Sequence, residues 1–389
     1  MARGKTVPIT PAVLTWAIEQ SGYTRQQIAT KLDIDVAKLE AWEQDDHEKP
    51  NLTSFKALAN VLKRPSAVLL LSEPPKASPP AVEFRHPPNI GRTFLNPTER
   101  CYLREVTRLQ RTVAWIRSEL GNTAISVPKV ELGSDVENTA TAIRQQLSVP
   151  VSDQLRWQNS SIALKEWRDI LEESGVLVFL LQLGKDSCQG FSLWDDRAPV
   201  IASNTWWNPE ARIYTLFHEY AHLLTRTNSA CVQNGSTSLS RGDDPAERWC
   251  EQFAAALLLP WDRVQDFIRI QFNWLPGRTI SDLDWVRRIA RHFKVSLRAV
   301  TLRLIGKKAA TWDLYEKIPS WSDEKRGGGG GGGRRRAQAR EDTFGSRTID
   351  VFLIAIREDL ISRADALSYL DIPDFDLERF ERDGVRSSG

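Results

Sequence analysis

Long apolar segments are absent from this chain of 389 residues. No run approaches the roughly 18 apolar residues that a membrane-spanning helix needs, which excludes an integral membrane protein. The N-terminal segment MARGKTVPITPAV is basic, but it lacks the apolar stretch and the small-residue cleavage site of a secretory signal. We therefore expect a cytoplasmic protein.

Cysteine is scarce as well. The four cysteines, Cys101, Cys188, Cys231 and Cys250, are scattered and form no C-x-x-C pair, which argues against a disulfide framework and against a thiolate zinc site. An excess of charge of one sign is also lacking, because the net charge is +2. Global electrostatics therefore favour neither nucleic acid nor a membrane as a partner, and such a function must come from a local motif.

The chain is long enough for two or three domains, each with its own core. In residues 1–72, apolar residues at helical spacing predict four or five short helices. Thr24 and Gln27 match a capping box that opens the second helix, and Asp35 can cap the third. Only a three-residue turn is left between these two helices, which predicts a helix-turn-helix domain.

A proline-rich stretch, residues 73–95, disfavours both helix and central strand and predicts a linker or an extended arm. In residues 96–306 the pattern predicts a domain of mixed helix and strand, with three short apolar runs between Gly175 and Asn204 as the strands. Asn208 and Pro209 predict the start of the helix that follows them.

The last part of the chain is divided by an unusual run. Residues 307–345 contain seven consecutive glycines and the basic cluster Arg334 to Arg336, and predict a linker, because no compact fold can be built from that run. Residues 346–389 regain amphipathic helical spacing and predict a small helical extension.

The segment TLFHEYAHLLT carries His218, Glu219 and His222 within a predicted helix. The four-residue separation places both imidazoles on one face, about one turn apart, as two ligands for Zn²⁺. A catalytic zinc site uses three protein ligands and leaves a fourth position for water, from which Glu219 can take a proton and deliver it to the leaving amine. The pattern predicts one zinc ion per chain and peptide hydrolysis. The alternative is two core histidines that are satisfied by hydrogen bonds.

The third ligand should come from the helix that begins near Pro245, which offers Glu247 and Glu251 on one face. Their like charges repel, and a dication would relieve that repulsion. We expect Glu247 as the ligand, with Glu251 as a supporting residue or as the ligand in its place; an exposed acidic face is the alternative. No oxyanion donor stands out. The candidates by residue type are His86, His292, Tyr214 and Tyr220.

Together, the strands, the HEYAH helix and the following segment ERWCEQFAAALLLP resemble the ImmA/IrrE family of metallopeptidases. In that family an H-E-x-x-H helix precedes a Glu-x-x-(Ala/Cys)-Asn-x-Phe-Ala segment that ends in Leu-Leu-x-Pro. The segments AVEFR and ALKEWRDILEESGVLVF and an N-terminal module of the XRE type extend the resemblance. By that pattern Glu247 falls on the family's ligand glutamate, but Glu251 stands where the family commonly has Asn, so the choice between the two stays open. The resemblance implies a transcriptional repressor as the substrate.

The N-terminal module offers little that favours binding to DNA. Lys38 is the only cation of its expected second helix, and the module has no basic stripe, so strong affinity for phosphates is not expected. Gln26, Gln27 and Lys31 on the preceding helix could also contact DNA. The alternative is that the module binds a protein, either the repressor substrate or a second copy of itself.

We therefore expect an α+β protein with an all-α helix-turn-helix module, a zincin-like domain with a small sheet, and a helical C-terminal extension. The expected activity is zinc-dependent cleavage of a regulatory protein, with Glu219 as general base and acid. The main rival is a helix-turn-helix transcription regulator whose zinc site is structural or sensory; a zinc hydrolase of a small amide is a third possibility. The sequence leaves the oligomeric state open.

Overall fold

A computed structural model describes residues 6–44, 48–75, 95–121, 125–185, 187–226, 229–231, 245–318 and 336–386. The chain divides into two compact units. Unit 1 comprises Met1–Ala81 and Arg92–Glu105, and unit 2 comprises Val82–Gly91 and Val106–Gly389. Most of the proline-rich stretch, with AVEFR and His86, and the glycine run lie outside the described residues. Within the described part of the chain, no helix is both long and apolar enough to cross a membrane.

Unit 1 is helical, as the spacing of its apolar residues predicts. Its elements are α1 (Pro11–Ser21), α2 (Arg25–Leu32), α3 (Val36–Gln44), α4 (Leu52–Leu62), the 3-10 helix η1 (Ser66–Leu70) and the first turns of α5 (Pro97–Glu119). Both predicted caps form: Thr24 and Gln27 exchange the two hydrogen bonds of a capping box, and Asp35 accepts a hydrogen bond from the backbone N–H of Ala37 (2.9 Å). The helices enclose a small core around Trp42, which is 1% exposed.

Unit 2 is built around a four-stranded sheet in the order β1-β3-β2-β4. The strands are β1 (Leu177–Leu181), β2 (Gly190–Leu193), β3 (Val200–Asn204) and β4 (Ser229–Cys231). β1 runs parallel to β3, whereas β2 runs antiparallel to both β3 and β4. Every residue of β2 and β3 is buried, including the polar residues Ser192, Ser203 and Asn204, because helices cover the sheet. The three predicted strands are present, and β4 is an additional one.

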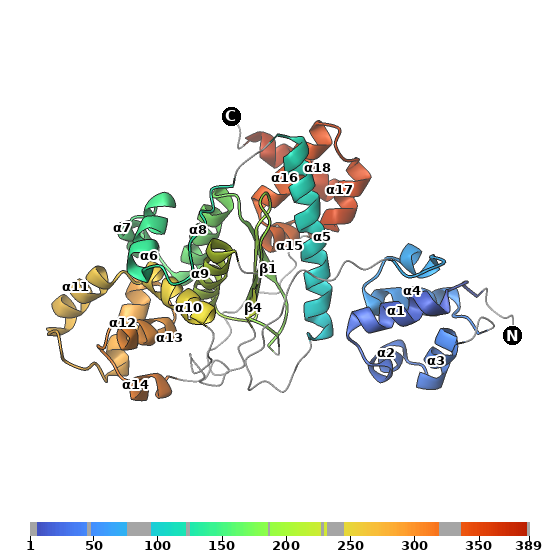
Figure 1. Cartoon of the computed structure of the whole chain (residues 1–389). Coiled ribbons are helices and arrows are strands. Elements are labelled where there is room, and N and C mark those ends of the chain that lie inside the picture. Colours follow the sequence, from blue (N-terminus) through green and yellow to red (C-terminus); the bar gives the residue numbers. More distant parts are fainter. Residues whose placement is uncertain are drawn as a thin grey trace. The chain divides into compact units, whose positions relative to one another are not determined.

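Thirteen helices besides the end of α5 accompany the sheet in the described part of unit 2. They are α6 (Val136–Gln146), α7 (Val151–Arg156), α8 (Ser160–Glu173), α9 (Pro209–Thr225), α10 (Pro245–Leu258), α11 (Trp261–Phe272), α12 (Leu283–Phe293), α13 (Leu297–Gly306), α14 (Trp312–Glu316), α15 (Arg336–Phe344), α16 (Ser346–Arg357), α17 (Arg363–Leu370) and α18 (Asp374–Arg386). Helix α9 packs against β2 and β3, and α8 packs against β1 (Figure 1). The helix with the H-E-x-x-H residues therefore lies directly on the sheet.

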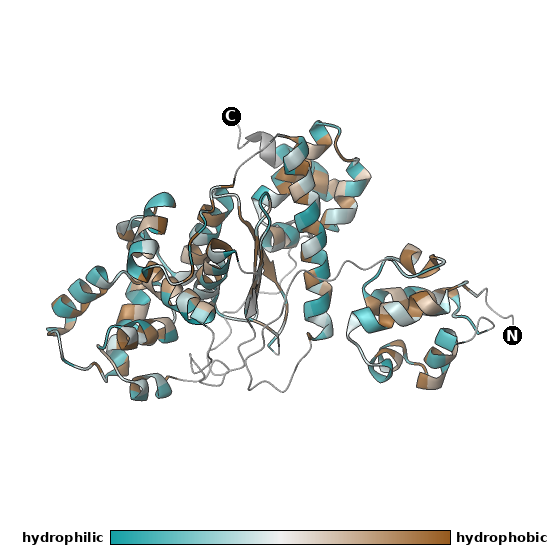
Figure 2. Ribbon diagram, viewed as in Figure 1, coloured by the Kyte–Doolittle hydropathy of each residue, from teal (hydrophilic) through white to brown (hydrophobic). Residues whose placement is uncertain are grey.

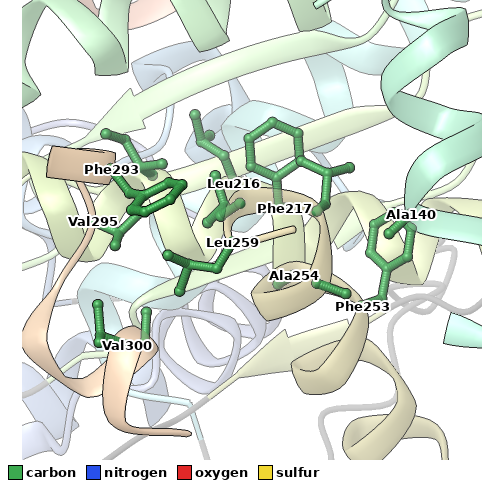
Figure 3. Packing of buried hydrophobic residues seen from close by; sticks show 14 of the residues in the cluster. Ala140, Leu216, Phe217, Phe253, Ala254, Leu259, Phe293, Val295 and Val300 are labelled. Carbon is green, nitrogen blue, oxygen red and sulfur yellow. The ribbon is translucent and has the colours of Figure 1, made fainter. Parts of the chain in front are cut away.

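The main core of unit 2 joins α9, α10 and the helices that follow them. Leu216 and Phe217 of α9 pack with Phe253 and Ala254 of α10 and with Phe293 of α12, all at most 1% exposed (Figure 3). Helix α12 carries both hydrophobic and hydrophilic residues (Figure 2), and its buried residues Val286, Ile289, Ala290 and Phe293 lie on one face. Because burying each Phe or Leu side chain stabilises the fold by about 1.5 to 3 kcal/mol, this core holds α9 and α10 firmly together.

The predicted linker at residues 307–345 is wrong in part, because α14 and α15 form within it. Phe344 of α15 packs edge-on against Phe179 of β1, with ring centroids 5.5 Å apart. Arg168 of α8 donates a hydrogen bond to the backbone carbonyl of Asp342 (2.7 Å). Helix α15 has little apolar periodicity of its own, so these contacts with β1 and α8 supply the stability that the sequence pattern does not indicate.

Candidate metal centre

Helix α9 is buried along most of its length. It is capped by the side chain of Asn208 and has Pro209 at its first position, as predicted. The sheet lies on one side of it and α10 on another. As a result His218, Glu219 and His222 are 5%, 0% and 2% exposed. Ionisable side chains are rarely buried to this extent without partners, so the residues that contact these three side chains define the candidate site.

The partner of the two histidines comes from the first turn of α10. Glu247 Oε2 lies 3.2 Å from His218 Nε2, and Glu247 Oε1 lies 3.4 Å from His222 Nε2. The two Nε2 atoms are 3.2 Å apart. Among the described residues these three side chains form a group of possible metal ligands whose donor atoms all lie within 4.8 Å of one another.

The donor set fits a zinc ion. Two imidazoles and a carboxylate are a common set of protein ligands in catalytic zinc sites, which leave a fourth position open. Zinc–ligand bonds of about 2.0 to 2.2 Å imply tetrahedral edges of about 3.3 to 3.6 Å. The distance of 3.2 Å between the two Nε2 atoms and that of 3.2 Å from His218 Nε2 to Glu247 Oε2 are close to these edges, and the second carboxylate oxygen, Oε1, lies 3.4 Å from His222 Nε2. His218, His222 and Glu247 could therefore bind a metal ion with little rearrangement.

The electrostatics of the cluster favour a positive charge among the three side chains. Burial by itself lowers the pKa of His218, but the carboxylate of Glu247, aided by Glu219 and Glu251, raises it to about 9. Burial raises the pKa of Glu247, but hydrogen bonds and charges from His218 and His222 hold it well below its usual range. A cation at this position would have the same electrostatic role as a proton on the histidines.

Glu219 lies next to the cluster, on the side of α9 that faces β2. Ser192 Oγ donates a hydrogen bond to Glu219 Oε2 (2.9 Å), and both residues are fully buried. Gly190 shares a face of the strand with Ser192, because side chains alternate along a strand. A Cβ atom on Gly190 would lie 2.5 Å from Thr215 Cγ2 of α9 and 2.6 Å from the Ala202 carbonyl oxygen, so glycine permits the close approach of β2 to α9.

Ser192 and Gly190 were not among the residues that the sequence singled out. Their only local signal is a small residue at every second position of GFSL, and the partner of Ser192 is 27 positions away. The sequence predicts which side chains of α9 gather at the site, but it does not show which strand positions the Glu219 carboxylate.

Glu251 lies on α10 one turn after Glu247, and its carboxylate is outside the three-residue donor group. Burial raises the pKa of Glu251 to about 7; His218 opposes this shift and Glu247 reinforces it. Tyr214 donates a hydrogen bond from its hydroxyl to the Glu251 backbone carbonyl (3.1 Å), and its ring stacks near His218 with centroids 6.4 Å apart. Tyr214 thus links α9 to α10 beside the cluster.

The other oxyanion candidates are not gathered around the donors. The ring of His292 on α12 stacks on Phe267 of α11, with centroids 4.2 Å apart. Tyr220 is fully buried and packs edge-on against Phe217. His86 lies outside the described residues. Among the described candidates, Tyr214 is therefore the one whose ring stacks beside a member of the donor group, His218.

The four residues considered for DNA contact, Gln26, Gln27, Lys31 and Lys38, are all exposed on α2 and α3. Two of them have intramolecular contacts. Gln27 Oε1 accepts a hydrogen bond from the backbone N–H of Thr24 (3.0 Å), and Lys31 Nζ lies 5.3 Å from the ring centroid of Tyr23. Within the described part of the chain, the side chains of Gln26 and Lys38 make no hydrogen bond, ion pair or ring contact of this kind.

A helix with an H-E-x-x-H sequence and a third carboxylate donor is the arrangement found in metal-dependent peptidases. Residues 171–304 match a family model, Peptidase_M78, described as the IrrE N-terminal-like domain. The match includes α9, α10 and all four strands, and it supports membership of the ImmA/IrrE family and a metallopeptidase-type function. The helices of unit 1 and the C-terminal helices α15–α18 lie outside it. A search of curated proteins found no match.

Proposed function

We propose that this protein is a zinc-dependent endopeptidase that cleaves a regulatory protein, a DNA-binding transcriptional repressor. The observation that carries the proposal is the convergence of His218, His222 and Glu247, with Glu219 buried beside them. When bound, Zn²⁺ would polarise the carbonyl of the scissile peptide and acidify a water molecule. The donor set of two imidazoles and one carboxylate suits this metal.

The residues of the chain would carry the proton transfers. Glu219 would take a proton from the attacking water and then deliver it to the leaving amine. Ser192 would hold one oxygen of this carboxylate, which fixes its orientation relative to α9. Because Glu219 is fully buried, its charge acts in a medium of low polarity, where electrostatic interactions are stronger than in water.

The repressor as substrate follows from the resemblance to the ImmA/IrrE family, with which a cytoplasmic location agrees. For unit 1 we infer a helix-turn-helix of the XRE type, formed by α2 and α3. Gln26, Gln27, Lys31 and Lys38 would contact DNA or, since the second helix also exposes Glu40, a protein partner such as the substrate. The near balance of charge on this unit favours weak binding to DNA that decreases with added salt.

Co-expression of the full chain with the repressor encoded next to it tests the proposal. Mass spectrometry should find one defined cut in the repressor, and this cut should disappear when zinc is removed with a chelator. Glu219→Gln should retain zinc and lose the cut. If the repressor is regulated equally well by Glu219→Gln, the protein is a zinc-sensing or zinc-stabilised regulator and not a peptidase.

A further inference from the structure

Residues 362–381 repeat the pattern of residues 24–43 at a constant offset of 338 positions. Seven of the twenty aligned residues are identical. They are Arg25 and Arg363, Leu32 and Leu370, Asp33 and Asp371, Ile34 and Ile372, Leu39 and Leu377, Glu40 and Glu378, and Glu43 and Glu381. The first segment forms α2 and most of α3 in unit 1, and the second forms α17 and much of α18 in unit 2.

The two segments also share their local hydrogen bonds. Each first helix has eight residues and opens with a capping box, on Thr24 in α2 and on Ser362 in α17. Each ends at an aspartate in the left-handed region, Asp33 with φ of 54° and Asp371 with φ of 51°. In the turn, Ile34 donates to the Ala29 carbonyl (3.1 Å), and its counterpart Ile372 donates to the Leu367 carbonyl (3.3 Å).

The same ion pair joins the two helices of each segment. Arg25 and Glu43 approach to 2.7 Å, and the equivalent pair, Arg363 and Glu381, approaches to 2.6 Å. The buried positions correspond as well. Leu39 and Leu377 are both 0% exposed, while Trp42 and Phe380 are 1% and 8% exposed. Two helices joined by a three-residue turn, with the same cap on the first helix, the same ion pair and the same buried positions, form the same helix-turn-helix arrangement.

Both helices of the C-terminal segment pack on α16, and α18 also packs on α15, but the start of α18 remains exposed. Arg108 of α5 donates to the Ser368 carbonyl (3.3 Å) and lies over the ring of Tyr369 (4.7 Å). On α18, by contrast, Phe375 is 66% exposed, and Asp374 and Glu378 are exposed near it. Most large apolar side chains of the described chain are buried, and an exposed aromatic side chain ringed by charges is the composition of a binding anchor.

The charge of this surface selects the kind of partner. A helix that reads DNA presents amide or basic side chains to base edges and needs cations near the phosphates. The first residues of α18 are instead acidic or aromatic, and Arg363 is already paired with Asp374 (2.5 Å) as well as with Glu381. A polyanion would gain little from these residues, whereas lysine and arginine side chains around an apolar pocket would complement Phe375 and Glu378.

We propose that residues 362–381 form a second helix-turn-helix, and that Phe375 and Glu378 of α18 bind a basic surface of a partner protein. This docking function goes beyond the proposed peptidase activity and does not require cleavage. The chain then has a related pair of helices in each unit, and the second pair binds a protein.

Binding assays with the full chain test the proposal. The probes are a short labelled peptide rich in lysine and leucine, its counterpart with glutamate in place of lysine, and a short DNA duplex of random sequence. The chain should bind the basic peptide, and the double variant F375A/E378K should weaken this binding at least about tenfold. Phe375 and Glu378 are exposed, so the variant should fold, which circular dichroism can verify.

Glu40→Lys is the matched control, because Glu40 occupies the position of Glu378 in unit 1 and is also exposed. It should leave binding of the basic peptide unchanged. Equal affinity of F375A/E378K and the unchanged chain for the peptide would overturn the proposal. An equal loss of peptide binding in Glu40→Lys would also overturn it. The same holds if the unchanged chain binds the DNA duplex and Phe375→Ala does not.

Discussion

The helix pair of unit 1 and helix α9 of unit 2 differ in what they bury. In α2 and α3 the buried residues are apolar, whereas Lys38 and Glu40 are exposed. Helix α9 buries His218 and Glu219 in addition to its apolar residues. Burying ionisable groups costs free energy unless partners or a metal compensate for it, so such a cluster indicates a functional site. A helix whose buried face is purely apolar gives no such indication, and its function must be inferred from its exposed face.

The largest effect that separates the two regions is expected from His222→Ala. Loss of one ligand should lower zinc affinity by more than about 100-fold, since even outer-shell changes cost about 10- to 100-fold. Cleavage should disappear with the metal. Zinc content measured by plasma mass spectrometry checks this, with His292→Ala as the control, because His292 stacks on Phe267 and should retain the zinc. A zinc-loaded His222→Ala protein would contradict the assignment.

Trp42→Ala should destabilise unit 1 and leave zinc binding in unit 2 unchanged. Trp42 is 1% exposed in the core of unit 1, and its truncation should lower the free energy of unfolding of that unit by about 3 to 5 kcal/mol. Hydrogen exchange should accelerate in α1–α4, while the zinc content stays the same. If zinc is lost together with the protection of α1–α4, the two regions are coupled and the comparison fails.

Ser192→Ala should slow cleavage by about tenfold and leave zinc in place, because it removes a hydrogen bond that orients Glu219 but no ligand. Rates of cleavage of the repressor at saturating zinc measure the effect. Ser203→Ala on β3 is the matched control, since Ser203 is equally buried in the sheet. Equal slowing in both variants would mean that the sheet, and not the Ser192 contact, is responsible.

A pH-dependent loss of stability is expected in unit 2. Burial raises the pKa of Glu137, but hydrogen bonds from Arg303 (2.5 Å) and Lys307 (2.8 Å) lower it to about 2. Because the pKa is lower in the folded state than in the unfolded chain, the ion pairs stabilise the fold above about pH 4.5. This stability is lost as the pH falls from 4.5 towards 2. Urea unfolding of Glu137→Gln should show a smaller loss over that range; an unchanged loss would contradict the prediction.

The smallest effect is expected at a helix cap of unit 1. The side chain of Asn51 accepts a hydrogen bond from the Ser54 N–H (2.9 Å) at the start of α4. Asn51→Ala should therefore lower stability by about 1 kcal/mol. Asn159→Ala removes the equivalent bond at the start of α8 (3.0 Å), and thermal unfolding of both variants compares the two units directly. If neither variant lowers the unfolding temperature, the caps do not contribute to stability.

Local rules predict much of the fold. Asn208 with Pro209 defines the start of α9, Thr24 with Gln27 forms the capping box of α2, and the three apolar runs form β1, β2 and β3. Strand β4 has only three residues, which is too short for a periodic pattern. Helix α15 was missed because its stability comes from Phe179 and Arg168, which are distant in the sequence.

The candidate site was predictable in its residue types but not in its arrangement. The spacing of His218 and His222 places both rings on one face of a helix, and spacing alone decides this. The choice between Glu247 and Glu251 depends on how α10 packs against α9, and local sequence does not contain that information. The structure brings Glu247 to both Nε2 atoms.

Zinc-edge X-ray absorption of the zinc-loaded full chain tests the central claim most directly. With His218, His222 and Glu247 as ligands, the spectrum should require nitrogen and oxygen neighbours at about 2.0 to 2.2 Å, with the scattering pattern of two imidazoles. His222→Ala should reduce that pattern to one imidazole or abolish binding. A sulfur neighbour at about 2.3 Å, or a spectrum that His222→Ala leaves unchanged, would contradict the account.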